Sequence, residues 1–417
     1  MYLVGGFRTP FCKFNTLLAD EPVYSLGSSP AKHLLATLGV DPEYVDEVIF
    51  GCCNQPATTL ANIARTIAVR SGVPETVPAS TVHRNCASGF EAITSAYDKA
   101  CNNRGDVFLV GGVESMSQAP FLFSRDATKK FTKLARSRTL FDKLGSIAQM
   151  RPSDFKPEIS LKMGMVDSLC DMSMGQTAEL LAREYNITRR DQDQFAESSH
   201  YKAIANSDKL EGEIATFYST EDNCIRSYSN KTVAVDNGIR NDADTHRLSQ
   251  LRTVFDKSGT VTAGNSSQVT DGGVALLLMT EKGLRKTNCT PLARIVDYAY
   301  AGCDPKRMGL GPVDAMARVC HTSGLKVRDA DLIEINEAFA AQVLAVLKYS
   351  KVVLEEIPKD ILNVNGGAIA LGHPLAATGA RLILTLAREL KHKNLNNGLA
   401  SLCIGGGQGG AIWIQKP

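Results

Sequence analysis

The two halves of this 417-residue chain repeat one order of sequence elements. In each half an apolar segment precedes a candidate reactive residue, which is followed by a helical segment and an apolar run that ends in glycines. The apolar segment leads the reactive residue by 37 positions from Ile49 to Cys86, and by 40 positions from Ile333 to His373. This shared order and spacing predict a duplicated α/β unit.

Short apolar runs bounded by glycine or polar residues predict the buried strands of this unit, and the segments between them predict helices. The expected strands are Val45–Gly51, Val107–Gly112, Leu332–Asn336, Leu399–Ile404 and Gly410–Ile414. The expected helices are Phe90–Cys101 and Gly379–Leu390. Such alternation is typical of a layered α/β fold.

A different kind of segment lies between the halves, over residues 119–265, which are richer in charge and lack buried-strand runs. Met174–Glu184 and Thr188–Asn206 are expected to form amphipathic helices, and Thr188 with Asp191 resembles an N-cap and its acidic first turn. An insertion of this size predicts a helical region that lies over the core and acts as a binding lid or a partner surface.

Composition excludes several classes of protein. Hydrophobic residues make up 44% and charged residues 22%, which is ordinary for a globular protein, and a net charge of +2 gives no global field for nucleic acid. The 11 cysteines include no CxxC pair and no signal-peptide pattern opens the chain, so we expect a reducing compartment and no metal site. No apolar run approaches the roughly 20 residues that a membrane-spanning helix needs.

Cys86 lies in the segment His83–Gly89, just before an expected helix. Backbone N–H dipoles at a helix N-terminus favour an anion, so this position is expected to lower the pKa of the thiol. The alternative is a buried structural cysteine, which is the commonest fate of this residue type. The segment alone leaves a nucleophile and a structural cysteine equally open.

A second segment, Asn363–Pro374, is rich in glycine, which lets backbone pass close to a ligand. His373 within it could take a proton from a nearby thiol, although a lone histidine is more often a hydrogen-bonded loop residue. Its place, which corresponds to that of Cys86 in the other half, favours the role of base.

Two further segments carry polar groups at the ends of strands. Cys403–Gly410 could be mistaken for a phosphate loop, but a strand rather than a helix follows its glycines, so we expect a tight hairpin with a thiol at its mouth. Asn336 follows another strand, where an asparagine either holds a water or oxyanion or simply terminates the strand in a turn.

Together these segments resemble the thiolase family. The motifs stand as NCASG at Cys86, NEAF at Asn336, GHP at His373 and CIGGGQG at Cys403, in the family's order, and the resemblance covers nearly the whole chain. Gly259–Ser267 resembles the family's CoA loop, and VESMS at 113–117 also matches.

The resemblance implies a duplicated, five-layered α/β/α/β/α core with an inserted helical loop domain. An N-terminal lobe would span residues 1–118 and be completed by 268–289. The loop domain, which would bind CoA, would span 119–267, and a C-terminal lobe 290–417.

The same resemblance implies roles for the motif residues. Cys86 would be the nucleophile, His373 its base, and Cys403 the group that moves a proton at the α-carbon of the acetyl unit. One oxyanion hole would use His373 and a water held by Asn336, and the other would use the N–H groups of Cys86 and Gly405. The CoA contacts would be Ser267, Met174, Phe339 and Ala338. Coenzyme A would be a substrate, and no cofactor or metal is expected.

The resemblance favours a 3-ketoacyl-CoA thiolase that releases acetyl-CoA and a shortened acyl-CoA by a reversible Claisen reaction. Ser173 stands where small-chain biosynthetic thiolases tend to carry histidine, which weakens an acetoacetyl-only assignment. A biosynthetic acetyl-CoA acetyltransferase is the alternative, and a non-catalytic acyl-CoA-binding scaffold is a remote one. Ketoacyl synthases share the fold but lack a second cysteine at the position of Cys403.

Partners are also expected from the resemblance. We expect a homodimer or homotetramer in the cytoplasm, or in the mitochondrial matrix for a processed eukaryotic chain. The loop region resembles the thiolase subunit of the fatty-acid oxidation trifunctional complex, which implies a hydratase–dehydrogenase partner. Arg125–Ala148 is expected to form one helix with an apolar stripe and a basic face, which either steers CoA phosphates as a lid or docks on a partner or an anionic membrane.

Overall fold

The N-terminal lobe is built on a five-stranded sheet. The computed structural model describes residues 1–55, 61–219 and 232–417 of the chain. The strands of this sheet are, in spatial order, β4 (Ala79–Val82), β3 (Glu47–Gly51), β5 (Val107–Glu114), β12 (Thr270–Met279) and β1 (Tyr2–Arg8). If these five strands are numbered by their order along the chain, their spatial order is third, second, fourth, fifth and first.

The C-terminal lobe repeats that order. Its strands are β14 (Leu332–Ile335), β15 (Asn397–Ile404), β16 (Gln408–Gln415) and β13 (Ala293–Gly302). Leu362 forms a parallel bridge to Ile333 and so lies beside β14, where β4 lies beside β3 in the other lobe. The two sheets meet where Tyr2 and Leu3 pair with β13. The predicted duplication is therefore confirmed.

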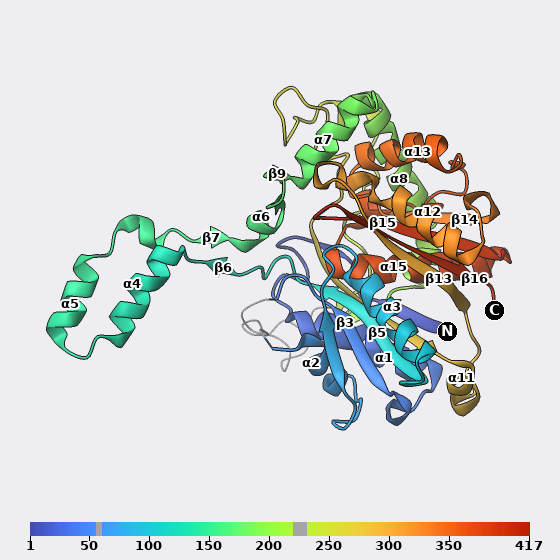
Figure 1. Cartoon of the computed structure of the whole chain (residues 1–417), viewed down its shortest axis with the longest axis horizontal. Helices are drawn as coiled ribbons and strands as arrows, with labels where there is room; N and C mark the ends of the chain where they lie inside the picture. Colours follow the sequence, from blue (N-terminus) through green and yellow to red (C-terminus); the bar gives the residue numbers. More distant parts are fainter. Residues whose placement is uncertain (56–60, 220–231) are drawn as a thin grey trace.

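Helices complete the five layers (Figure 1). The helices α1 (Val23–Leu38) and α2 (Ile63–Arg70) pack on the outer face of the N-terminal sheet. On the C-terminal sheet, α12 (Gly311–Ser323) and α13 (Ala340–Val353) take the same place. Between the sheets lie α3 (Ser88–Cys101) and α15 (Leu375–Lys393), whose apolar side chains share one core cluster with strands of both lobes. This arrangement confirms the α/β/α/β/α expectation.

The central helix α15 is apolar on nearly all sides, because it is covered by both sheets. Fourteen of its 19 residues are buried. Two of them are charged, and both are paired. The Arg381 guanidinium donates to Glu334 Oε2 at 2.9 Å in a buried ion pair, and Glu389 accepts from Lys209 at 3.0 Å. This helix begins two residues after His373, so the layer that joins the lobes also positions a candidate reactive group.

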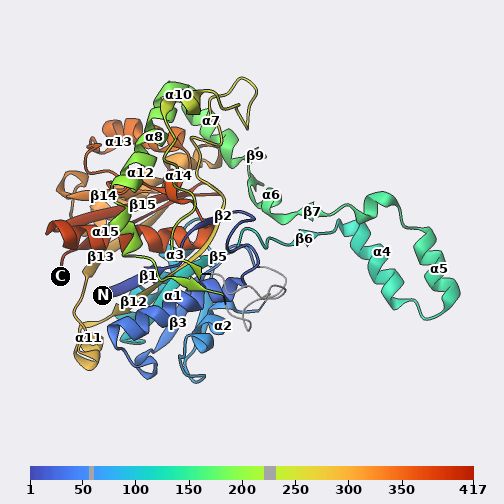
Figure 2. The same cartoon turned by 180° about the vertical axis from the view of Figure 1, so that it is seen from behind.

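The inserted segment has two parts that differ in their contacts. The helices α7 (Met174–Glu184) and α8 (Arg189–Ala205) pack on α13 and confirm the predicted helices over the core. Thr188 and Asp191 form the predicted capping box at the start of α8. The other part, residues 121–159, does not lie over the core but protrudes from it (Figures 1 and 2). For this part the expected position over the core is wrong, and its role as a lid or a partner surface stays a prediction.

The predicted single helix over Arg125–Ala148 is also wrong, because the chain forms two helices, α4 (Arg125–Arg136) and α5 (Leu140–Ala148). Ser137 is extended, and the Thr139 side chain accepts a hydrogen bond from the N–H of Asp142, which starts a new helix. The apolar spacing continues through this break, although Phe141 and Leu144 lie on an exposed face of α5 and do not extend a stripe along α4.

Smaller elements connect these parts. They are β2 (Cys12–Lys13), η1 (Pro42–Tyr44), β6 (Phe121–Leu122), η3 (Pro152–Phe155), β7 (Glu158–Ile159), α6 (Ser160–Gly164), β8 (Val166–Asp167), β9 (Met172–Ser173), α9 (Ser207–Glu211), β10 (Phe217–Tyr218), β11 (Thr232–Val233), α10 (Thr245–Ser249), α11 (Glu281–Thr287), η4 (Pro305–Leu310), η5 (Val327–Asp329) and α14 (Ala368–Leu371). The limits expected for the two lobes and the loop domain stay a prediction.

In the part of the chain that the structure describes, no helix is long and apolar enough to cross a membrane.

Candidate active site

Cys86 and His373 occupy equivalent places in the two lobes. Cys86 lies between β4 and the central helix α3. His373 lies between the bridge residue Leu362 and the central helix α15. These helices cross closely at their first turns, where a Cβ on Gly89 would lie 2.7 Å from the carbonyl oxygen of Ala376. Gly89 and Ala376 each stand three positions after the reactive residue of their lobe. The glycine thus allows the contact that brings the two loops together.

The environment of Cys86 acts on its thiol in two directions. Burial raises the pKa of Cys86, while hydrogen bonds from the backbone N–H groups of Gly405 and of Cys86 itself lower it. The net direction is upward, so the expectation of a lowered pKa at the helix N-terminus is wrong for the free protein. Desolvation outweighs the N–H donors because the thiolate has lost most of its contact with water.

His373 is held in the form that can accept a proton. Burial lowers its pKa to about 4, and the nearby Arg381 guanidinium acts in the same direction. The Thr378 hydroxyl donates to the carbonyl of Pro374 and lies 2.6 Å from Nδ1 of His373. Its oxygen therefore accepts from Nδ1–H, which leaves Nε2 as the unprotonated nitrogen.

These two shifts predict how Cys86 reacts in the free protein. Burial disfavours both charged forms, so the neutral thiol–imidazole pair is favoured over the thiolate–imidazolium pair. The rate of Cys86 alkylation by iodoacetamide should therefore rise about tenfold per pH unit between pH 5 and 8. Mass spectrometry of the Cys86 peptide measures this rate, and a pH-independent plateau over that range would show a preformed ion pair instead.

Cys403 lies beside this pair at the end of β15. Burial is the main cause that raises the pKa of Cys403, and the charge of neighbouring Cys86 adds to it. The chain then turns through Gly406 and Gly407, which have φ values of +89° and +76°, into β16. The predicted hairpin with a thiol at its mouth is confirmed.

Two side chains fix the backbone of that turn. The Asn85 amide donates to the carbonyl of Gly405 at 2.8 Å, which leaves the N–H of Gly405 facing the Cys86 sulfur. From the inserted segment, buried Asp167 accepts the N–H of Gly406 at 2.9 Å and the N–H of Leu169 at 2.8 Å. The N–H donors at Cys86 are thus positioned from both lobes and from the insertion.

Asn336 follows β14 and faces the histidine. Its Nδ2 lies 3.4 Å from Nε2 of His373, and its backbone N–H donates to the carbonyl of Ser401. Among the residues that the structure describes, no group donates to its buried Oδ1. Asn336 therefore presents polar atoms toward the same point as His373.

The four predicted CoA contacts lie together on one side of this centre. Ser267 donates its backbone N–H to the carbonyl of Ala338 at 2.9 Å. Ala338 and Phe339 share an apolar cluster with Cys403, and Met174 packs against this cluster. Their proximity fits a common binding surface, while their role as CoA contacts stays a prediction.

A cavity of about 460 Å³ opens at Cys86. Its apolar lining is Met116, Leu161, Met165, Val166, Leu169, Met174 and Leu375. Most of these residues come from the inserted segment around α6 and β8, so the insertion forms one wall of the cavity. In the described part of the chain no group of histidines, cysteines and carboxylates could hold a metal ion.

Sequence reasoning missed several residues of this centre. Thr378 stands five positions after His373, and Asn85 stands inside the quoted NCASG motif, so proximity in sequence could have suggested both. Glu114, in VESMS, accepts N–H bonds from Cys53, Asn54 and the first turn of α15. Nothing in the sequence around Asp167 indicated its contact, since its partner lies 239 positions away.

Comparison with known proteins decides the family. The N-terminal domain model of thiolases matches residues 1–282, and the C-terminal domain model matches residues 289–416. The chain belongs to the thiolase family. These matches cover both lobes and the insertion, so the repeat, the fold and the order of the motifs all belong to one family of acyltransferases.

Related thiolases match over their full length. The human mitochondrial 3-ketoacyl-CoA thiolase is 39% identical, with 100% of this chain and 98% of the relative covered. A probable acetyl-CoA acyltransferase of Staphylococcus aureus strain N315 is 38% identical, with 99% and 98% covered.

Solved thiolase structures match equally well. The Bacillus anthracis acetyl-CoA acetyltransferase superposes with a TM-score of 0.89 at 34% identity, and it covers 100% of this chain and 98% of its own. The human mitochondrial 3-ketoacyl-CoA thiolase in complex with CoA has a TM-score of 0.88 at 37% identity, with the same coverage.

Proposed function

We propose that this thiolase cleaves 3-ketoacyl-CoA with CoA to acetyl-CoA and a shortened acyl-CoA. The observation that carries the proposal is the pair of neighbouring thiols, Cys86 and Cys403, with two N–H donors at Cys86, and the close approach of the loops that hold Cys86 and the neutral His373. A single thiol would suffice for acyl transfer alone, whereas breaking a carbon–carbon bond also needs a proton donor at carbon.

The reaction would begin at Cys86. Nε2 of His373 takes the thiol proton, and the Cys86 sulfur attacks the 3-keto carbon. The carbonyl oxygen becomes an oxyanion held by the N–H groups of Cys86 and Gly405, which already face this sulfur. Collapse of the adduct breaks the bond between carbons 2 and 3, which leaves an acyl thioester on Cys86.

The electron pair of the broken bond passes to the departing acetyl-CoA as an enolate. His373 and a water on Asn336 would hold the enolate oxygen, and the Cys403 thiol gives its proton to the carbon. A raised pKa suits Cys403 to this step, because it keeps the group protonated until the carbanion forms. The sulfur of CoA then takes the acyl group from Cys86, and the CoA proton restores Cys403. The Cys86 sulfur leaves as a thiolate and takes back its proton from Nε2 of His373.

The apolar lining of the cavity favours substrates longer than acetoacetyl-CoA. Methionine side chains at three of its positions adapt to flexible acyl tails. Thiolysis rates on 3-ketoacyl-CoA of four and of sixteen carbons test this, with enolate absorbance as the measurement. Activity on the four-carbon substrate alone would favour the alternative, an acetyl-CoA acetyltransferase. No activity on either would overturn the proposal.

Asp167 should act as a positioning residue for this reaction. Asp167→Asn removes the charge from the group that accepts the Gly406 N–H, so we expect kcat to fall roughly tenfold, less than the 10²–10³-fold for loss of an oxyanion donor itself. The KM for CoA should hardly change. Asp171→Asn, at an exposed position in the same segment, is the matched control. A change confined to KM would contradict the assignment.

We also propose a homodimer. The strand β4 has half-buried side chains in the single chain and leads directly to the Cys86 loop. No described strand pairs with its outer edge, which could pair with the same edge of a second copy. Light scattering at micromolar concentration should give at least twice the chain's mass of 44.9 kDa. A stable monomer would contradict this prediction. A tetramer, a hydratase–dehydrogenase partner, the compartment and the absence of a cofactor stay predictions.

A further inference from the structure

The hairpin of α4 and α5 stands clear of the catalytic core. It leaves the core through β6 and returns through β7, which pair as a two-stranded ribbon (Figures 1 and 2). Contacts within the hairpin and its base hold it together. The hydroxyl oxygens of Ser137 and Ser146 lie 3.2 Å apart, within hydrogen-bond distance, and the Phe131 ring packs between those of Phe123 and Phe155. The hairpin is therefore a defined structure whose outer surface contacts nothing else in the described chain.

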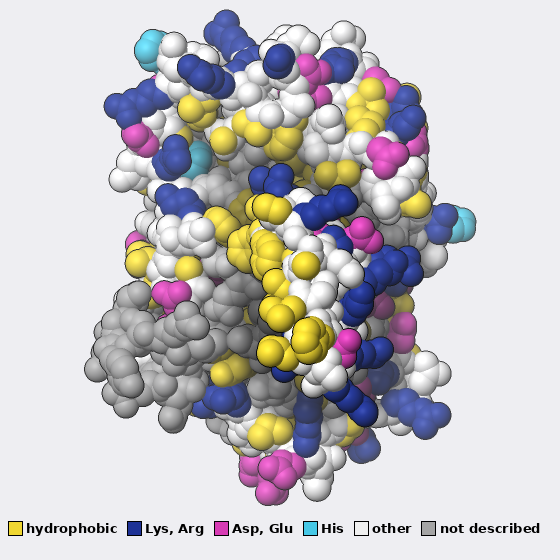
Figure 3. Space-filling view, turned by 90° about the vertical axis from the view of Figure 1, so that its left-hand side faces the viewer, with side chains coloured by type: hydrophobic (Ala, Val, Ile, Leu, Met, Phe, Trp, Pro, Cys, Tyr) yellow, Lys and Arg dark blue, Asp and Glu magenta, His cyan; other side chains and the backbone are white. Residues whose placement is uncertain are grey.

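One face of α5 is apolar and exposed. Leu140, Phe141, Leu144 and Ile147 are spaced so that they share this face, and 72%, 87%, 54% and 52% of their surfaces are exposed. Figure 3, which views the molecule from the hairpin side, shows a continuous hydrophobic band there. A band of this kind on a soluble protein marks an interaction surface.

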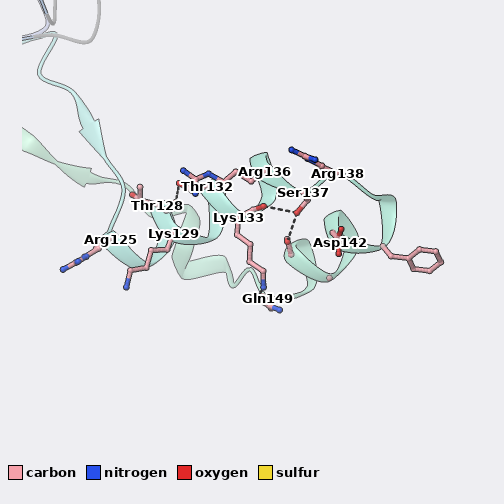
Figure 4. A pocket seen from close by; sticks show the side chains of 13 residues that line it. Arg125, Thr128, Lys129, Thr132, Lys133, Arg136, Ser137, Arg138, Asp142 and Gln149 are labelled. Atoms are coloured by element: carbon pink, nitrogen blue, oxygen red, sulfur yellow. Dashed lines mark hydrogen bonds between the residues drawn. The ribbon is translucent and has the colours of Figure 1, made fainter.

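The charges beside this band have one sign. Residues 125–148 hold seven basic and two acidic side chains, a difference of +5, while the whole chain carries only +2. Figure 4 shows Arg125, Lys129, Arg136 and Arg138 pointing outward around a hollow of about 1050 Å³ between the helices. Of the basic residues, Lys130 is paired with Asp154. Arg125, Lys129, Arg136 and Arg138 make no ion pair with a described carboxylate.

The exposed apolar face of α5 and the unpaired basic side chains beside it together indicate which kind of partner fits. A second copy of the hairpin would bring like charges together, which disfavours self-association. An anionic bilayer supplies both complements, because amphipathic helices bury their apolar face at the headgroup boundary while basic side chains contact the phosphates. We propose that the α4–α5 hairpin docks this protein on an anionic lipid surface, with Leu140, Phe141, Leu144 and Ile147 inserted.

Docking would also place the catalytic cavity near the lipid. The return strand β7 runs directly into α6 and β8, which line the cavity at Cys86. Long acyl-CoA molecules are amphiphiles that partition into bilayers, so a surface-bound enzyme would meet them where they concentrate. This consequence rests on the proposed function, whereas docking itself does not.

Sedimentation of the full chain with vesicles tests the proposal. The wild type should sediment with phosphatidylserine–phosphatidylcholine vesicles and not with phosphatidylcholine alone, and salt should weaken its binding. The triple variant Lys129→Gln, Arg136→Gln, Arg138→Gln should bind roughly 100-fold more weakly. The matched control Lys32→Gln, Lys257→Gln, Lys391→Gln removes three exposed charges from the core and should bind almost like the wild type. Thiolysis of acetoacetyl-CoA without vesicles should be unchanged in both variants.

A second measurement reports insertion directly. Tryptophan emission of Phe141→Trp should shift to the blue on anionic vesicles, against the buried Trp413 as background. The proposal is overturned if the wild type does not sediment, or if the triple variant binds as the control does. It is also overturned if the triple variant only weakens CoA binding in a salt-dependent way, which would show steering, or if the hairpin binds only a protein partner or a second copy.

Discussion

Replacing Cys86 with alanine should abolish turnover of 3-ketoacyl-CoA. The sulfur forms the covalent bond in the proposed reaction, and alanine offers no nucleophile in its place. Burial, the main cause of the raised pKa of Cys403, persists in this variant and keeps the second thiol protonated. Loss of a nucleophile from a catalytic set of this kind typically costs about 10⁶-fold in kcat. The thiolysis rate measured at the enolate absorbance should therefore fall to background.

Mass spectrometry shows whether turnover is lost because the acyl group can no longer attach to Cys86. Wild-type protein incubated with acyl-CoA should gain one acyl mass on the Cys86 peptide, and Cys86→Ala should gain none. Cys53→Ser is the matched control, because Cys53 lines the same cavity and its thiol contacts the carbonyl of Asn85 at 3.0 Å. This variant should keep the acyl mass. An acyl group found only on Cys403 or Cys53 would show that the nucleophile is wrongly assigned.

The sequence predicted best those elements whose neighbours in space are also neighbours in sequence. The helix Met174–Glu184 has the expected bounds, and α8 begins at its expected cap, because apolar periodicity and capping side chains act within a few residues. The duplicated order could be predicted for a related reason: each lobe buries its own strands, so each carries the full pattern.

Long-range contacts and the effects of burial could not be predicted from the sequence. The contact of Asp167 with Gly406 joins the insertion to the far end of the chain, and no local pattern records it. The direction of the Cys86 pKa shift was predicted wrongly, because the helix terminus is visible in sequence whereas desolvation depends on every layer packed around the thiol. The break between α4 and α5 was missed because the apolar spacing continues across it.

Replacing Cys403 with serine should separate the two halves of the chemistry. Acyl transfer between Cys86 and CoA needs only the sulfur, His373 and the N–H donors. Cleavage also needs a proton at the α-carbon, and a serine hydroxyl is a far weaker acid than a thiol. We expect thiolysis of 3-ketoacyl-CoA to fall by about 10²–10⁴-fold, the usual contribution of a general acid.

Exchange of the acetyl group between acetyl-CoA and dephospho-CoA measures the first half alone. In Cys403→Ser this exchange should keep most of its rate, because the thioester on Cys86 forms and breaks without carbon chemistry. The exposed Cys101→Ser should leave both rates unchanged and serves as a control for cysteine loss. An equal fall of exchange and thiolysis in Cys403→Ser would mean that Cys403 supports the Cys86 site as a whole, since buried Cys403 packs in the apolar cluster of Ala338 and Phe339. Unequal falls would place its proton at the carbon–carbon bond.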